Sequence, residues 1–238
     1  MFFMPTTTRP QNFLLTSLSE ADFELVKPHL KPHEFERGSV LYQAGDPIRR
    51  VYFPDSGIIS SVVELSSGQA IEIAMIGRDT LAGGMFAMDG KISLNKGIVQ
   101  IGGTGWTIDV DKLRTITQQS STFARALIIH EQIVFAQAQQ SAACNAVHSL
   151  EARMARWLLY VRNLVDGGTL QLTQEFLSQI LGVQRSSVSL VATRLQQEGL
   201  IQYRRGHLEI VNLDRLSAVA CECYGVVKAH RDRLLSEG

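Results

Sequence analysis

Apolar residues in the C-terminal third of the chain follow a helical period on both sides of a glycine. In residues 172–181 they are spaced as on one buried face of a helix, and Thr173 is suited to cap the start of that helix. Gly182 predicts the turn that ends it, because glycine adopts the left-handed conformation at little steric cost. The same period resumes over residues 184–199, so the pattern predicts two short helices joined by a tight turn.

Two short alternating strands are expected in residues 200–211, around the pair Arg205-Gly206. A helix-turn-helix followed by a basic hairpin is typical of a winged helix, whose second helix lies in the DNA major groove. Arg185 begins that second helix, where a guanidinium can donate two hydrogen bonds to guanine. The alternative is an ordinary helical hairpin with a solvated polar face. The residues expected to contact DNA are Thr173, Gln184, Arg185, Ser186, Ser187, Ser189, Arg204 and Arg205.

The N-terminal half has a different pattern, in which short apolar runs alternate with turn signals between residues 38 and 109. Strands are expected at residues 40–42, 51–53, 58–63, 71–76 and 98–101, after one or two short helices between residues 12 and 30. Many short strands at such spacing indicate an antiparallel sandwich or roll. A pocket inside a roll is a natural ligand site, but a filled core is the default.

Residues 111–147 are almost free of glycine and proline and predict a long helix. A heptad seam runs along it, with a second apolar stripe at Ile128, Phe135 and Ala142. So wide an apolar surface needs two partners, and we expect the chain's own roll and a second protomer. The alternative is a helix buried wholly in its own domain. The seam expected at the dimer interface comprises Ala126, Ile129, Ile133, Ala136, Gln140, Ala143 and Val147.

The seam stops near His148, where a new helix over residues 150–164 is expected, and a last helix over residues 213–235 follows the hairpin. The predicted class is therefore α+β. An antiparallel β-roll sensor domain is expected over residues 12–120, a dimerisation helix over 121–148, and a winged helix-turn-helix DNA-binding domain with a C-terminal helix over 149–238.

Composition narrows the possible functions. The 238 residues carry no net charge, so any nucleic-acid contact must come from a local patch. Three cysteines make no disulfide framework, and no apolar run reaches transmembrane length, which predicts a cytoplasmic protein without a membrane partner. No nucleophile elbow, P-loop or dinucleotide fingerprint occurs, so we expect no enzyme. One such patch lies between residues 185 and 207, where four arginines outnumber a single acid, Glu198. The arginines are Arg185, Arg194, Arg204 and Arg205.

A roll, a long helix and a winged helix in this order resemble the Crp/Fnr superfamily of bacterial transcription regulators. The most specific part is LTQEFLSQILGVQRSSVSLVATRLQQEGLI, which fits the superfamily's DNA-reading motif without a gap. The resemblance implies a cyclic-nucleotide-binding-like jelly roll, a homodimer, double-stranded DNA as ligand and RNA polymerase as partner. It makes Arg185 the guanine reader and Thr173 a phosphate contact. An adaptor that uses its winged helix to bind protein is the alternative function.

Two departures from the family pattern concern the DNA reader, and two more concern the ligand. The family has an acidic base-contacting residue at the position of Ser186 and a basic one at the position of Leu190. The operator should therefore differ from the standard site. In nucleotide-binding members a glutamate binds the ribose and an arginine binds the cyclic phosphate. This chain has Gly84 at the position of that glutamate and Ser93 at the position of that arginine. We therefore expect no binding of cyclic AMP in the usual way. The candidate effector pocket comprises Gly83, Gly84, Met85, Phe86, Ser93 and Leu94.

Signals for a cofactor are weak. The N-terminal cysteine cluster of the family's oxygen sensors is absent, and His29, His33 and His130 fit no haem motif. The remaining group is Cys221 and Cys223 with His230, whose spacing fits no standard zinc knuckle. If that segment is helical, the two thiols point in different directions. We therefore expect neither a cofactor nor a metal.

Overall fold

A computed structural model describes residues 9–85, 92–165 and 169–236 of the chain. Phe86, one of the candidate pocket residues, lies outside these ranges. The helices are α1 (Phe13–Ser17), α2 (Glu20–Val26), the 3-10 turn η1 (Lys27–His29), α3 (Val110–Gln119), α4 (Ser121–Val147), α5 (Leu150–Leu164), α6 (Gln174–Leu181), α7 (Arg185–Gln197), α8 (Leu213–Val219) and α9 (Cys223–Ser236). The strands are β1 (Lys31–Phe35), β2 (Val40–Tyr42), β3 (Arg50–Pro54), β4 (Ile58–Glu64), β5 (Ala70–Ile76), β6 (Lys96–Ile101), β7 (Gly103–Asp109), β8 (Thr169–Gln171), β9 (Ile201–Arg204) and β10 (His207–Ile210).

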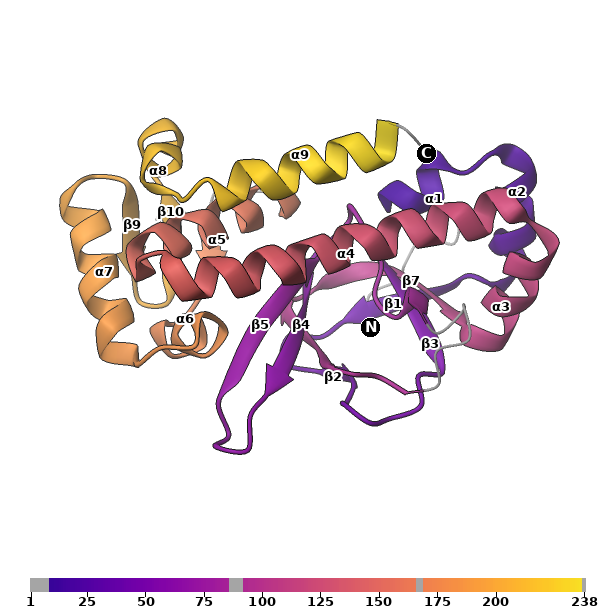
Figure 1. The fold of residues 1–238 in the computed structure, drawn as a ribbon, viewed down its shortest axis with the longest axis horizontal. Helices are drawn as coiled ribbons and strands as arrows, with labels where there is room; N and C mark the ends of the chain where they lie inside the picture. The colour runs from indigo at the N-terminus through magenta and orange to yellow at the C-terminus, as the bar shows by residue number, and fades with distance from the viewer. Residues whose placement is uncertain (1–8, 86–91, 166–168, 237–238) are drawn as a thin grey trace.

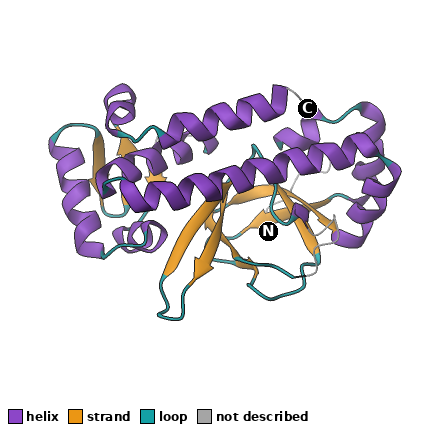
Figure 2. Cartoon of the chain, viewed as in Figure 1, coloured by secondary structure: helices purple, strands orange, loops and turns teal. Residues whose placement is uncertain are grey.

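The N-terminal strands form two antiparallel sheets, in the orders β1-β7-β3 and β2-β6-β4-β5. Their inner faces enclose one apolar core, which includes Phe53, Val99 and Ile108. Helices α3 and α4 continue this core through Leu113 and Leu127. Figure 2 shows the strands of the roll gathered beneath the long helix. The α+β class and the antiparallel roll predicted from the sequence are confirmed.

Two strands of the roll, β1 and β7, were not predicted from the sequence. The segment that forms β7 begins GTG and lacks the apolar alternation that marks a strand. Its glycines allow close backbone contact: a Cβ on Gly105 would lie 2.3 Å from the carbonyl oxygen of Phe53 on β3. Strand β7 lies between β1 and β3, so these glycines are in the central strand of a sheet, where the backbones approach closely.

The helix predicted over residues 111–147 is in fact two helices, broken at Ser120. The Ser120 side chain accepts a hydrogen bond from the backbone N–H of Phe123 and donates one to Asp22 of α2 at 2.5 Å. These contacts make Ser120 the N-cap of α4. Helix α4 is 27 residues long and extends along most of the molecule, from α3 to the C-terminal part (Figure 1).

The segment after the hairpin is likewise two helices rather than the single helix predicted over residues 213–235. Helix α8 ends at Val219 and α9 begins at Cys223, so Cys221 lies outside a helix. Helix α9 then returns along α4, and the two lie side by side over much of their length (Figure 1). Within the described ranges, no helix has the length and apolar character needed to cross a membrane.

The C-terminal part packs on the edge of the roll through α5 and β5. The indole N–H of Trp157 donates to a carboxyl oxygen of Glu72 at 2.8 Å, and Ser60 donates to the other oxygen. Burial raises the pKa of Glu72 to about 7, although both hydrogen bonds oppose the shift. Nearby, the side chain of Ile71 lies against Gly182 of the helix-turn-helix. The roll and the C-terminal part thus share a contact with a buried carboxyl at its centre.

Candidate nucleic-acid interface

The first helix of the helix-turn-helix, α6, has well-defined ends. The Thr173 side chain accepts from the backbone N–H of Phe176 at 3.1 Å and caps its start. Leu177 and Leu181 are buried against α5 and α7. Gly182 ends the helix with φ of +65°, a conformation that glycine adopts without strain. The turn predicted from the sequence is therefore present at the predicted residue.

The second helix, α7, has one buried and one exposed face. Val188, Ala192 and Leu195 are buried in the core of the C-terminal part. Opposite them, Arg185 and Ser186 are exposed at the first turn, and Leu190 is 74% exposed one turn later. An apolar side chain so exposed beside polar readers fits contact with a thymine methyl group.

Not every residue predicted to contact DNA is equally available. Gln184, Arg185 and Ser186 lie together and exposed at the start of α7, while Ser187 is half-buried. The Ser189 hydroxyl donates to Gln174 of α6 at 2.6 Å and contacts the backbone oxygen of Arg185 at 3.1 Å. Ser189 therefore connects the two helices as well as bordering the exposed face.

The hairpin β9–β10 has the geometry of a tight two-residue turn. Arg205 and Gly206 both have positive φ, +51° and +79°, which matches the twist of the flanking strands. Arg204 and Arg205 are exposed at its tip. The base of the hairpin is held to the start of α6, since the Tyr203 hydroxyl donates to the carbonyl of Leu172 at 2.8 Å. Strand β8 completes this sheet in the order β8-β10-β9.

Arg194, counted in the basic patch from sequence, belongs to an ion-pair network instead. Its Nε lies 3.2 Å from carboxylate oxygens of Glu151 on α5 and of Glu198 at the end of α7. Two acids therefore balance this arginine, and it joins α7 to α5. The basic surface is formed by Arg185 at the first turn of α7 and by Arg204 and Arg205 on the wing.

The loop expected to hold an effector is closed by a carboxylate from α4. Glu131 accepts a hydrogen bond from the backbone N–H of Met85 at 2.9 Å, and the N–H of Gly84 also points to it. A Cβ on Gly84 would lie 2.5 Å from the Glu131 oxygen. Burial raises the pKa of Glu131 to about 7, against these hydrogen bonds. Within the described part of this loop, the backbone N–H groups of Gly84 and Met85 are thus already paired with Glu131.

Ser93, at the place of the family's arginine, is 2% exposed and part of a tight turn. Its hydroxyl donates to the carbonyl of Asn95 at 2.5 Å, and its backbone N–H donates to that of Asp46 at 2.9 Å. Lys96 forms an ion pair with Glu64 at 2.7 Å. Leu94, by contrast, is 84% exposed. With Met85 it lines an apolar groove of about 490 Å³ between the roll and α4. Of the described candidate pocket residues, Ser93 is therefore enclosed in its own turn, whereas Met85 and Leu94 line the groove.

The heptad seam predicted on α4 faces inward for much of its length. Ile133 is 2% exposed, and Gln140 donates to Cys223 of α9 at 3.0 Å. Ala126 and Ile129 line a cavity of about 390 Å³ together with Leu235 of α9. These four residues of the predicted seam therefore pack within the protomer, because α9 covers this side of α4. Ala143 and Val147 at its end are exposed.

A parallel stripe one residue away is open to solvent and is called the outer stripe below. Ile128 is 45% and Phe135 is 62% exposed. The spacings of four and three residues repeat along the stripe without a charged side chain. The outer stripe comprises Ile128, Gln132, Phe135, Gln139 and Ala142.

Comparison with known proteins agrees with this architecture. Profiles of two domain families match the chain: the cyclic nucleotide-binding domain over residues 32–120 and the Crp-like helix-turn-helix domain over residues 152–219. No curated protein matches the chain.

Similar solved structures come from several bacteria. FixK2 from Bradyrhizobium japonicum is 18% identical, with 81% of this chain and 98% of FixK2 covered at a TM-score of 0.70. The c-di-GMP-responsive regulator CLP from Xanthomonas campestris is 16% identical, with coverages of 82% and 100% and a TM-score of 0.68. A crp/fnr-family regulator from Eubacterium rectale is 19% identical, with coverages of 87% and 97% and a TM-score of 0.67. The two domain matches, in this order and on this fold, show that the chain belongs to the Crp/Fnr superfamily of DNA-binding transcription regulators.

Proposed function

We propose that this protein is a homodimeric regulator that binds duplex DNA in a sequence-specific manner and reads guanine through Arg185. The observation that carries the proposal is the position of Arg185 at the first turn of α7, exposed beside Gln184 and Ser186. The N-terminal residues of a recognition helix are those that reach base edges in the major groove. Arg204 and Arg205 on the wing would then contact phosphates.

The dimer in this proposal forms through the outer stripe of α4 rather than through the seam predicted from sequence. An uncharged stripe with an exposed phenylalanine at heptad spacing favours a second copy of the same helix. Two-fold symmetry about α4 would present two recognition helices to a palindromic site, with half-sites about one DNA turn apart.

The roll in this proposal does not take cyclic AMP in the usual way. A cyclic phosphate would carry its negative charge toward Glu131, which already accepts the backbone N–H groups of the loop. Of the two nearby lysines, Lys96 is paired with Glu64, and Lys91 lies outside the described residues. An unpaired anion in such a place would cost several kcal/mol. In this proposal either the dimer binds DNA without an effector, or a different effector binds in the apolar groove beside Leu94. Because Ile128 and Phe135 of the outer stripe also line that groove, such an effector would lie at the dimer interface.

Other parts of the proposal follow from membership of the superfamily. The protein would act in the cytoplasm, and RNA polymerase would be its partner on promoters.

Selection of binding sites from a random duplex library tests the proposed function. The expected result is one enriched, roughly palindromic site, with a guanine in each half that Arg185→Ala no longer selects. Failure to enrich any sequence, with retention of a specific protein partner, would favour the adaptor instead.

Calorimetry with cyclic AMP and cyclic GMP tests the ligand part separately. We expect no binding tighter than about 10 micromolar, or roughly −7 kcal/mol. A tighter complex with either nucleotide would show that the loop rearranges to accept the phosphate.

A further inference from the structure

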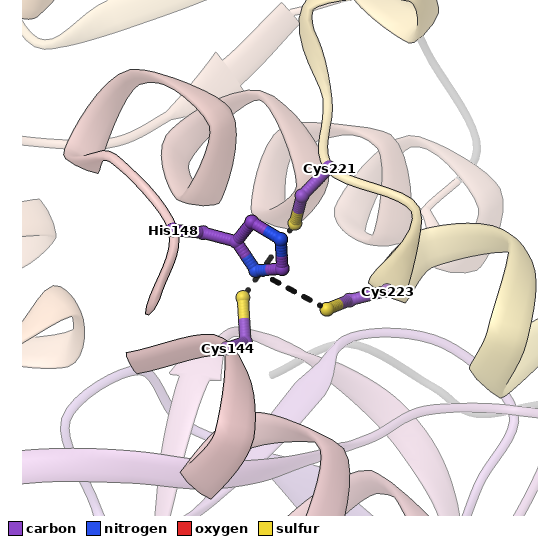
Figure 3. Close-up of side chains that lie close together, drawn as sticks. All are labelled: Cys144, His148, Cys221 and Cys223. Carbon is purple, nitrogen blue, oxygen red and sulfur yellow. Dashed lines mark hydrogen bonds between the residues drawn. The ribbon is translucent and has the colours of Figure 1, made fainter. Parts of the chain in front are cut away.

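Four side chains that bind metals in other proteins converge at the junction between the roll and the DNA-binding part. Cys144 comes from the last turn of α4, and His148 from the residue that ends it. Cys221 precedes α9, and Cys223 is its first residue. Figure 3 shows the three thiols and the imidazole directed toward one another. One ligand atom from each residue lies within 4.8 Å of the others.

The distances fit a single ion held between the four atoms. The Sγ atoms of Cys144 and Cys221 are 3.5 Å apart, and Cys223 Sγ is 3.5 Å from Nδ1 of His148. In a tetrahedral zinc site with Zn–S bonds of about 2.3 Å, neighbouring sulfurs are separated by about 3.8 Å. Small adjustments of side-chain torsions would therefore complete the site without moving either helix.

The histidine is oriented as a metal ligand would be. Its Nδ1 faces the thiols, while its Nε2 lies 3.1 Å from the carboxylate of Glu222. A carboxylate that accepts the second ring N–H leaves the lone pair of the other nitrogen free for a metal. Glu222, between the two cysteines in sequence, thus holds the imidazole in position.

The surroundings suit thiolates and a closed site. All three cysteines are buried, and Gln140 donates to Cys223 Sγ at 3.0 Å. The Nε atoms of Arg153 and Arg156 are buried and have no hydrogen-bond partner among the described residues. Three thiolates around a divalent cation leave one excess negative charge, and these arginines would balance it.

We propose that Cys144, His148, Cys221 and Cys223 form a structural Zn²⁺ site. Four protein ligands fill a tetrahedral ion, which is typical of structural rather than catalytic zinc. Thiolate and imidazole ligands favour zinc over magnesium or calcium. The site differs from the sequence expectation in three respects. Cys144 of α4 is an additional ligand that the sequence group did not include. His148 takes the place considered for His230, which is exposed on α9, and Cys221 lies outside the helix, so both thiols can face one ion.

The zinc would stabilise the junction between α4 and α5, which is called the joint below. His148 and Ser149 separate α4 from α5, the first helix of the C-terminal part. The ion would connect this joint to the start of α9. Farther along α9, Arg231 pairs with the buried Asp79 of the roll at 3.4 Å. With zinc bound, α9 is held both to the joint and to the roll, so the orientation of the recognition helix depends on the metal.

Metal analysis of the full-length protein, purified with a reductant and without added metal, tests the site first. We expect about one equivalent of zinc per chain, released when the thiols are blocked by a mercurial. Cobalt(II) added to the metal-free protein should give intense d–d bands of tetrahedral geometry and thiolate-to-cobalt charge transfer. These readouts use the wild-type chain and do not depend on how any variant folds.

Variants identify the ligands and the supporting carboxylate. His148→Asn should abolish the tetrahedral cobalt spectrum, whereas His230→Asn, the same change at an exposed position of α9, should leave it intact. Glu222→Gln should retain the spectrum but weaken zinc affinity by about 10–100-fold. Equal behaviour of His148→Asn and His230→Asn would overturn the ligand assignment.

Three results would overturn the proposal as a whole. The first is a metal-free protein that takes up no cobalt with thiolate charge transfer. The second is a Cys144–Cys221 disulfide in the protein purified under reductant, found by mass spectrometry. The third is iron with acid-labile sulfide in place of zinc.

Discussion

The start of α7 and the loop of the roll near Gly84 are the places that correspond to the DNA and nucleotide sites of the family, and they differ in how their polar groups are used. At the start of α7, Arg185 is exposed beside other polar side chains. At the roll loop, Glu131 accepts the backbone N–H of Met85, and the Ser93 hydroxyl is satisfied within its own turn. The start of α7 therefore presents a hydrogen-bond donor to solvent, whereas the described donors of the roll loop are paired within the chain.

This difference is the basis for proposing that the chain binds DNA but not a cyclic nucleotide. Binding of an anion requires donors that are not already paired, because an exchange of one hydrogen bond for another contributes little net free energy. In the proposed function, Arg185 at the start of α7 meets that condition, and the backbone N–H groups of Gly84 and Met85 do not. The following predictions test this contrast from the largest expected effect to the smallest.

Phe135→Asp should have the largest effect on DNA binding. It places a carboxylate on the outer stripe of each protomer, and a buried unpaired charge costs several kcal/mol at an interface. Loss of the dimer would leave one half-site contact, so affinity for the operator should fall by more than a hundredfold. Light scattering measures the dimer, and Phe13→Asp on α1, also at an exposed phenylalanine, is the matched control. A wild-type monomer at micromolar concentration would refute the dimer altogether.

Arg185→Ala should cost about 1–3 kcal/mol per half-site and relax the preference at one base pair. The reason is that a bidentate guanidinium contact to guanine carries sequence information, whereas phosphate contacts do not. Titration of the selected operator and of single-base variants measures both effects. An equal loss of affinity on all sequences would contradict the role of Arg185 as a base reader.

Stability should fall as pH rises from about 4.5 to about 7, because burial raises the pKa of Glu72 despite its hydrogen bonds with Ser60 and Trp157. Its pKa is about 7 in the fold against an ordinary value of 4.5, so the folded state binds more protons in that range. The full contribution is present below about pH 4.5 and is lost as pH passes 7, up to about 3 kcal/mol.

Glu72→Gln should flatten that part of the pH profile, measured by urea unfolding. Glu131, also with a pKa of about 7, contributes in the same range, so some slope should remain. Glu34→Gln on the exposed face of β1 is the matched control. An unchanged profile in Glu72→Gln would contradict the neutral buried carboxyl.

Arg204→Ala should have the smallest effect. As a phosphate contact on the wing it should weaken binding to all sequences alike and lower the slope of log affinity against log salt by about one unit. Titrations of the operator and of a scrambled duplex over a range of salt concentrations measure this slope. A loss confined to the operator would make Arg204 a base reader instead.

The winged helix could be predicted from the sequence because its determinants are local. Thr173 caps the helix that follows it, Gly182 turns the chain where it stands, and the Arg205-Gly206 pair sets its own turn. Each of these acts within a few residues of its position in the chain. Arg194 was counted in the basic patch because its partner Glu151 is 43 residues away, beyond any local pattern.

Which apolar stripe of α4 faces solvent could not be predicted, because two stripes one residue apart have the same period. Which of them faces solvent depends on α9, which returns along α4 from the far end of the chain. Ile133 was therefore placed at a dimer interface although it is buried within the protomer. Phe135, in the second stripe, is the exposed position.

The two most informative contacts were also the least accessible to sequence reasoning. Glu131 closes a loop 46 residues before it, and Cys144 meets Cys221 across 77 residues. His148 carried no signal because its partners lie in another segment. A pattern of neighbouring residues cannot show such a pairing, which only the return of α9 to the end of α4 creates.

Operator binding in the presence and absence of cyclic nucleotides tests the contrast most directly. The measurement is the dissociation constant of the wild-type protein for its selected operator, without nucleotide and with saturating cyclic AMP or cyclic GMP, at one fixed salt concentration. If the DNA end is available and the nucleotide loop is closed, the protein binds the operator in all three cases with the same affinity. A tightening of tenfold or more by either nucleotide, equivalent to about 1.4 kcal/mol of coupling, would contradict this account.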